Sequence, residues 1–298
     1  MSQPKRGFFT DYLSTAEVNF SKGIANELKK ASWAQKLLND TKISYALNIQ
    51  PNQQIKYSQF NQIKSALFEV RFAYALYTKQ LAAEYEEKIG VGNSTVDFKV
   101  QNNGNSWLIE LTSLRESEAV KSSTSTNKAN ITQYVSIDKG INNSAEVLDL
   151  IKLQNAIYRK VMEKIGNKIQ LIKFPNVTKN TYHTIVVDAR SFNAGIYDYY
   201  DFFIVINGSL RLRNIHEGFC CRYFIDKEGR TSHILGIFEK SNDDERSKIV
   251  REKIHFICFI VEKEYKPNEI SEKMLIFANP QYFHDPKAVE KIWLFKQR

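Results

Sequence analysis

The sequence predicts an α/β (α+β) fold in which a mixed central sheet is flanked by helices. Two long stretches carry apolar residues at helical spacing, and short apolar runs typical of strands stand between and after them. An Asn-Gly pair at 103–104 joins two of these runs in the way that favours a β-hairpin. The resulting order of helix, three strands, helix and further strands indicates a sheet covered by helices.

Composition narrows the class of protein. The chain has 298 residues, of which 43% are hydrophobic, and this length suits one large domain or two small ones. No run of about 18 apolar residues exists, so we expect no membrane span. The N-terminus lacks the apolar core of a secretory signal, and three cysteines form neither a disulfide framework nor a zinc pattern. We therefore expect a cytoplasmic protein, and the net charge of +9 favours a polyanionic partner.

Residues 1–57 look like an N-terminal helical extension, and residues 58–298 like the main domain. The first long helix is expected over residues 58–80, with two apolar stripes. Glu69 falls within the second stripe, where a carboxylate is costly unless something binds it. Alternatively, Glu69 reaches the rim of the domain or meets a distant arginine.

The predicted hairpin over residues 94–114 carries an acid in each arm. A type I′ turn at 103–104 sets a register in which Asp97 lies directly opposite Glu110. Like charges so placed are destabilising, so the two carboxylates need a cation between them. The alternative is that this polar face points at water, with Lys99 screening the pair. The same register predicts one apolar face, formed by Val96, Phe98, Val100, Trp107, Ile109 and Leu111.

A second long helix is expected over residues 144–172, after a polar loop at 116–140. Helical geometry places Gln154 near the centre of its buried stripe, Lys168 on the edge and Lys164 on the shoulder, while Lys160 points away. Further strands are expected at residues 82–89, 183–189, 201–208, 233–240, 255–263 and 273–280.

The order of the acids resembles that of the PD-(D/E)XK nuclease superfamily, which has the restriction-endonuclease-like fold. The residues that carry this resemblance are Glu69, the "VDF" at 96–98 and the "IELT" at 109–112. The "FANP" at 277–280 is also similar to the C-terminal part of several uncharacterised bacterial relatives. The resemblance covers residues 58–190 well and the later strands loosely.

Two positions depart from the pattern of the superfamily. Val96 stands where proline is common, which matters little. Thr112 stands where the catalytic lysine is usual, and in some relatives that amine comes from the following helix. The resemblance then implies Lys168, or as second choice Lys164, although both could be ordinary surface lysines. Thr112 and Gln154 would be supporting residues, or Gln154 simply an interior amide.

The resemblance implies metal-assisted phosphodiester hydrolysis by an endonuclease-type hydrolase. Asp97, Glu110 and the Leu111 carbonyl would bind Mg²⁺ or Mn²⁺, hard ions that prefer oxygen. Glu69 would reach the ion directly or through water, and Lys168 would stabilise charge at the scissile phosphate. The substrate would be DNA in preference to RNA, and the protein could form a homodimer. Arginines among aromatics could grip a nucleic-acid backbone, or belong to a solvated loop: Arg211, Arg213 and Arg222.

A different class of function stays open at this point. Because Thr112 replaces the usual lysine, the chain could be a catalytically degenerate member of the fold. Such a protein would bind nucleic acid or another protein without cleaving it, since a fold alone does not determine an activity.

Overall fold

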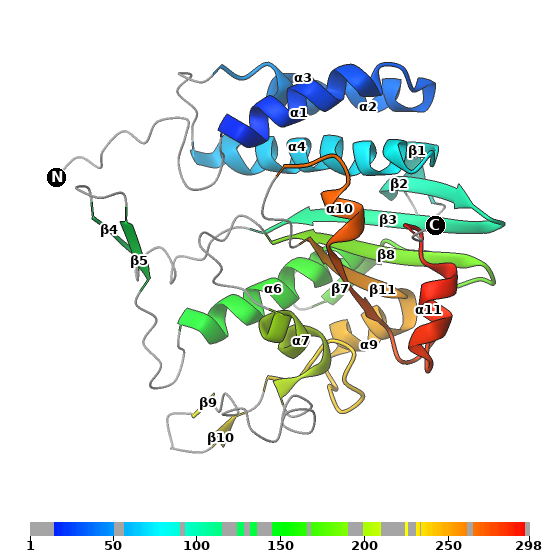
Figure 1. Ribbon diagram of the computed structural model, residues 1–298. Coiled ribbons are helices and arrows are strands. Elements are labelled where there is room, and N and C mark those ends of the chain that lie inside the picture. The colour runs from blue at the N-terminus through cyan, green and yellow to red at the C-terminus, as the bar shows by residue number, and fades with distance from the viewer. Residues whose placement is uncertain are drawn as a thin grey trace.

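The fold is mixed α/β, with a mixed sheet of six strands between layers of helices (Figure 1). The strands lie in the order β1-β2-β3-β8-β11-β12. The computed structural model describes residues 15–50, 57–89, 93–114, 124–127, 132–135, 145–165, 168–189, 199–209, 224–225, 231–232, 234–260 and 265–295. No helix in these ranges is long and apolar enough to cross a membrane.

The sheet combines antiparallel and parallel pairs. Strands β1, β2 and β3 form an antiparallel meander, β3, β8 and β11 run parallel, and β12 closes the edge antiparallel to β11. The strands are β1 Ala83–Lys88, β2 Thr95–Asn102, β3 Asn105–Ser113, β8 Thr181–Asp188, β11 Phe256–Ile260 and β12 Met274–Ala278. The short two-stranded pairs are β4 Thr124–Asn127 with β5 Thr132–Val135, β6 Met162–Ile165 with β7 Lys168–Ile172, and β9 Phe224–Ile225 with β10 Thr231–Ser232.

Helices cover both faces of the sheet (Figure 1). One face carries α1 Thr15–Leu28, η1 Ser32–Ala34, α2 Gln35–Leu38, α3 Thr41–Leu47 and α4 Tyr57–Thr78. The other carries α6 Ala145–Val161, α7 Tyr199–Asn207 and α9 Glu245–Lys253. Two shorter helices, α10 Glu269–Glu272 and α11 Pro286–Ile292, flank β12 in the chain. Alternate residues of the central strands enter the two cores, as Ile109 and Leu108 do, because side chains of a strand alternate between faces.

The N-terminal helices share the hydrophobic core of the domain. Side chains of α1, α3 and α4 belong to one buried cluster together with residues of the sheet. A buried ion cluster also links these layers, because Arg71 of α4 lies 2.8 Å from Glu17 of α1 and 3.1 Å from Asp188 of β8. The boundary expected at residue 57 therefore separates two segments that are packed together.

The second long helix is shorter than the sequence predicts. It ends at Val161 and is followed by the β6–β7 hairpin, so Lys164 and Lys168 lie on strands and the prediction that they belong to this helix is wrong. A sequence signal for this existed, because Gly166-Asn167 is a dipeptide that commonly joins hairpin strands.

Two predicted strands are also absent at their expected places. Residues 201–207 of the run predicted at 201–208 fall in helix α7, because a short apolar run fits a buried helix as well as a buried strand. Residues 234–240 contain no strand and pack against that helix, where the Ile237 and Phe238 N–H groups donate to the Val205 and Ile206 carbonyls. The predicted helix at 58–80 and the strands at 82–89, 183–189, 255–263 and 273–280 are confirmed, with small shifts of their ends.

Candidate active site

The hairpin that carries the two acids has the predicted register near its turn. Asn103 and Gly104 have φ angles of 51° and 76°, as a type I′ turn requires. Backbone pairs run from Asn102–Asn105 back to Phe98–Ile109. This local part of the prediction is confirmed.

Strand β2 is distorted where Asp97 stands. The Leu111 N–H donates to the Asp97 carboxylate, at 2.6 Å between Leu111 N and Asp97 Oδ2. On the other side of β2, Tyr85 pairs with Phe98 and Glu87 with Val96, and Glu86 between them has a φ of 46°. A positive φ is uncommon for a residue other than glycine. The backbone pairing of β2 with both of its neighbours is therefore interrupted beside this acid.

The distortion also changes the face on which Val96 lies. The predicted apolar face is confirmed for Phe98 and Ile109, which are buried in the core under α4. Val96 instead belongs to the core under α6, so its expected place on the same face is wrong. A regular pleat would have kept Val96 and Phe98 on one face, which shows that the strand twists at Asp97.

The cation between the two acids is the amine of Lys160, from the last turn of α6. Its Nζ lies 2.9 Å from Glu110 Oε2 and 3.7 Å from Asp97 Oδ2. The expectation that Lys160 points away is wrong, because the buried stripe of α6 is centred on Leu153 and Ile157, whereas Ile151 is exposed. With the stripe so placed, the long side chain of Lys160 can follow the apolar surface and bring its amine to the sheet.

Glu69 joins this group from the opposite layer. It lies on α4, and its Oε2 accepts a hydrogen bond of 2.6 Å from the Tyr85 hydroxyl. Burial and, after it, the charge of Asp97 raise the pKa of Glu69 to about 8. Because α4 and α6 cover opposite faces of the sheet (Figure 1), Glu69 comes from one helical layer and Lys160 from the other, while Asp97 and Glu110 lie on the sheet between them.

The charges of this cluster depend on one another. Burial and the charge of Asp97 raise the pKa of Glu110 to about 7, while Lys160 opposes the shift. Burial works against the charge of Lys160, but the carboxylates of Asp97 and Glu110 nevertheless raise its pKa. Carboxylates whose pKa values are raised in this way bind protons or cations readily, and such shifts are typical of functional sites.

The donor set fits a hard divalent cation held by two carboxylates. Mg²⁺ commonly uses one or two carboxylates and completes its shell with water and substrate phosphate. Asp97 and Glu110, which both contact the Lys160 amine, could hold Mg²⁺ or Mn²⁺ in this manner. Leu111 lies beside them, because its backbone N–H donates to the Asp97 carboxylate. Within the part of the chain that the structure describes, no three His, Cys, Asp or Glu residues form a cage for a metal ion. Glu69 is linked to this pair through the charge of Asp97, which contributes to its raised pKa.

The other residues proposed from the sequence have different surroundings. Gln154 donates to the Val205 and Leu235 carbonyls, at 3.1 and 2.8 Å, which makes it the interior amide of the two alternatives. Thr112 pairs with Val187 of β8 and is half-buried. Arg211, Arg213 and Arg222 lie outside the described residues.

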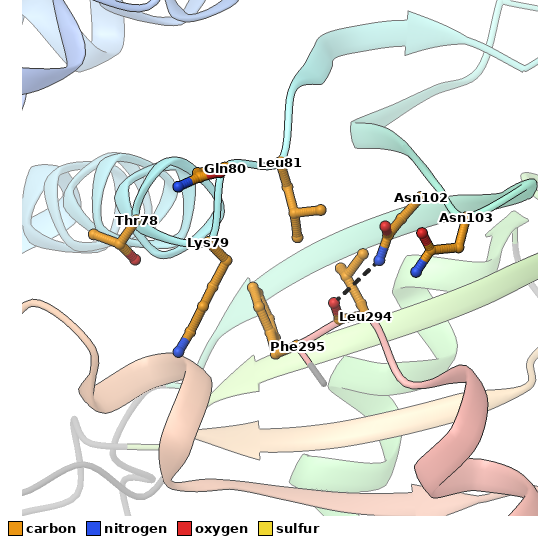
Figure 2. A pocket seen from close by; sticks show the side chains of 8 residues that line it. All are labelled: Thr78, Lys79, Gln80, Leu81, Asn102, Asn103, Leu294 and Phe295. Carbon is orange, nitrogen blue, oxygen red and sulfur yellow. Dashed lines mark hydrogen bonds between the residues drawn. The ribbon is translucent and has the colours of Figure 1, made fainter. Parts of the chain in front are cut away.

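A separate cavity of about 290 Å³ lies at the other end of the hairpin (Figure 2). It forms between the end of α4, the hairpin turn and the C-terminal segment, where Asn102 Nδ2 donates to the Leu294 carbonyl at 3.4 Å. Its lining residues are Thr78, Lys79, Gln80, Leu81, Asn102, Asn103, Leu294 and Phe295. None of them is an acid, so this cavity takes no part in the cluster around Lys160.

Comparison with protein-family models, curated proteins and solved structures gives no match. The function is therefore inferred from the site itself.

Proposed function

We propose that this protein is a divalent-metal-dependent nuclease that hydrolyses phosphodiester bonds of nucleic acid, with DNA preferred over RNA. The observation that carries the proposal is the contact of the Lys160 amine with both Asp97 and Glu110. Two carboxylates and an amine at adjacent strands are the constellation that the resemblance to the PD-(D/E)XK superfamily implies. Lys160 takes the role for which Lys168 and Lys164 were candidates, and so supplies the amine that Thr112 lacks.

The order of elements around the site supports the same proposal. The chain order is a helix with Glu69, three antiparallel strands with Asp97 and Glu110, the short β4–β5 pair, and then a helix with Lys160. A restriction-endonuclease-like core is therefore the finer description that we propose for this mixed α/β fold. The net charge of +9 is consistent with a polyanionic substrate.

Each residue of the cluster has a distinct task in this proposal. Asp97 and Glu110 would hold Mg²⁺ or Mn²⁺, which when bound supplies an activated water and neutralises phosphate charge. The Lys160 ammonium would stabilise the negative charge that develops on the phosphate oxygens. Burial and the charge of Asp97 raise the pKa of Glu69, and positive charge that arrives beside this carboxyl would favour loss of its proton.

A cleavage assay with matched variants tests the proposal. Supercoiled plasmid and labelled DNA and RNA oligonucleotides are incubated with the protein in Mg²⁺, Mn²⁺ or EDTA. We expect cleavage in either metal and none in EDTA, and a loss of about 100-fold or more in Asp97→Asn and Glu110→Gln. Glu84→Gln, which changes an exposed acid of β1 bonded to Lys99, should cleave like wild type.

Two results would count against a nuclease. Absence of cleavage in both metals would contradict it, as would cleavage that survives both substitutions. Gel shifts without cleavage, unaffected by Asp97→Asn, would instead support the non-catalytic binding module.

A further inference from the structure

The Tyr85 hydroxyl fixes the position of the Glu69 carboxylate. The hydrogen bond between them is 2.6 Å long, and Tyr85 is only 5% exposed. The ring of Tyr85 packs against Phe98, with 5.5 Å between ring centroids, and the two residues are paired across β1 and β2. A buried ring with these neighbours cannot swing freely, so Glu69 is held wherever the backbone of Tyr85 is held.

That backbone is in turn held by Lys36 of α2. The Lys36 Nζ donates to the Tyr85 carbonyl at 2.6 Å and to the Glu86 carbonyl at 3.0 Å. Glu86 has the positive φ of 46° noted above, a conformation that persists only where the surroundings enforce it. One amine therefore binds two consecutive carbonyls at the irregular point of β1.

This irregular point lies beside Asp97. Tyr85 pairs with Phe98 and Glu87 with Val96, so Glu86 stands next to Asp97 along the β1–β2 ladder. Lys36 itself is exposed and lies on the N-terminal layer, 49 residues before Tyr85. The exposed Lys36 is connected to the site through two backbone carbonyls and the buried Tyr85 hydroxyl. Filling of the hydrophobic core does not require this connection.

We infer that Lys36 and Tyr85 are positioning residues for Glu69, so that the N-terminal helical layer belongs to the working parts of the site. The inference rests on the proposed nuclease function. Lys36 holds β1 at the bend beside Asp97, the bend places the Tyr85 hydroxyl, and the hydroxyl orients the Glu69 carboxylate towards the acid pair. Loss of residues that orient the groups around a metal commonly lowers metal affinity or activity by 10- to 100-fold.

Metal binding and kinetics of four variants test this inference. Binding of Mn²⁺ alone is followed by electron paramagnetic resonance, and DNA cleavage by steady-state kinetics. We expect Lys36→Ala and Tyr85→Phe each to weaken Mn²⁺ binding and to lower kcat by about 10-fold, with KM for DNA nearly unchanged. Lys36→Arg should restore most of both, because a guanidinium can also donate to two carbonyls. Lys29→Ala, which changes the exposed lysine directly after α1 that is bonded to Asn26, should behave like wild type.

A double variant adds a sharper criterion. Because both residues act through one hydrogen bond to Glu69, Lys36→Ala with Tyr85→Phe should lose little more than Tyr85→Phe alone. Fully additive losses, or a loss in Lys36→Ala that follows only a lowered unfolding midpoint, would overturn the inference.

The outcomes separate this inference from the proposed function. If wild type binds Mn²⁺ and cleaves DNA while Lys36→Ala and Tyr85→Phe do so equally well, the positioning role is wrong and the nuclease stands. If wild type neither binds Mn²⁺ nor cleaves, the nuclease is wrong and the positioning role is overturned with it.

Discussion

The amine of Lys160 lies 2.9 Å from the carboxylate of Glu110, although α6 and β3 bring them together from positions 50 residues apart. The side chains are 29% and 7% exposed, so solvent and salt screen this pair less than a surface ion pair. The same amine reaches Asp97, which explains how two acids of one hairpin can coexist at the end of their ladder.

Removing this amine should reduce activity more than stability. We expect Lys160→Ala to lower kcat by about 100-fold or more, because stabilisation of the developing phosphate charge is lost. The measurement is cleavage under saturating DNA, with circular dichroism to verify the fold. Arg159→Ala, an exposed neighbour on α6, removes the same charge and should remain active. Wild-type activity in Lys160→Ala would return the role to Lys168 or Lys164.

Neutralising Glu69 should stabilise the fold at high pH. The pKa of Glu69 is raised from its ordinary value to about 8 by burial and by Asp97, so its ionisation opposes folding as pH rises from about 4.5 to about 8. Glu69→Gln removes that cost and leaves an oxygen to accept from Tyr85. We expect it to be more stable than wild type by about 1 to 3 kcal/mol at pH 9, with little difference at pH 5.

Urea unfolding at the two pH values measures this difference. The control is Glu84→Gln, which removes an exposed carboxylate of β1 and should change the free energy of unfolding by less than about 1 kcal/mol. A constant difference between wild type and Glu69→Gln at both pH values would contradict the raised pKa.

A buried histidine pair should make the fold sensitive to acid. The backbone N–H of His183 donates to His255 Nδ1 at 3.1 Å, and burial lowers the pKa of the His183 side chain to about 4 and that of His255 to about 3. In the unfolded chain both take up protons near pH 6.5, so the stability they contribute above that pH is lost as pH falls towards 4. We expect a loss of about 2 to 4 kcal/mol between pH 7 and pH 5 from this pair.

A substitution separates the histidines from the other titrating groups. His255→Gln keeps a hydrogen-bond acceptor and should show about half of the acid-induced loss, measured as the difference from wild type in thermal unfolding. The comparison with wild type is needed because the pKa values of Glu69 and Glu110 are raised, so these two residues make the fold more stable as pH falls, whereas the histidines make it less stable.

Arg71 should be essential for the attachment of the N-terminal helices. Replacing it by methionine leaves the buried carboxylates of Glu17 and Asp188 without this partner, which costs about 3 to 5 kcal/mol for a broken buried pair. Urea unfolding gives the value. Lys79→Met, one residue beyond the end of the same helix, breaks only a partly exposed contact of 4.0 Å with Glu272 and should cost less than about 1 kcal/mol. Equal stabilities of the two variants would contradict a structural role for Arg71.

The elements that the sequence predicted well are those with a local signal. Asn103-Gly104 specified the hairpin and its register near the turn, and the stripes of residues 58–80 specified α4, because both depend on the conformations of neighbouring residues. The end of α6 and the helical state of residues 199–207 were missed. The apolar run of residues 199–207 fits two conformations, and packing against the rest of the chain selects one. The end of α6 was missed although Gly166-Asn167 is a dipeptide that commonly joins hairpin strands.

By itself, the sequence determined which acids are candidate site residues. Glu69, Asp97 and Glu110 stand at positions where a charge conflicts with its apolar neighbours. Only the tertiary structure decided which amine meets them. The orientation of Lys160 depends on how α6 rotates against the sheet, and the place of Glu69 depends on Tyr85 and Lys36, which lie far from it in the chain or on another layer. Such contacts follow from the packing of whole elements, which no short stretch of sequence encodes.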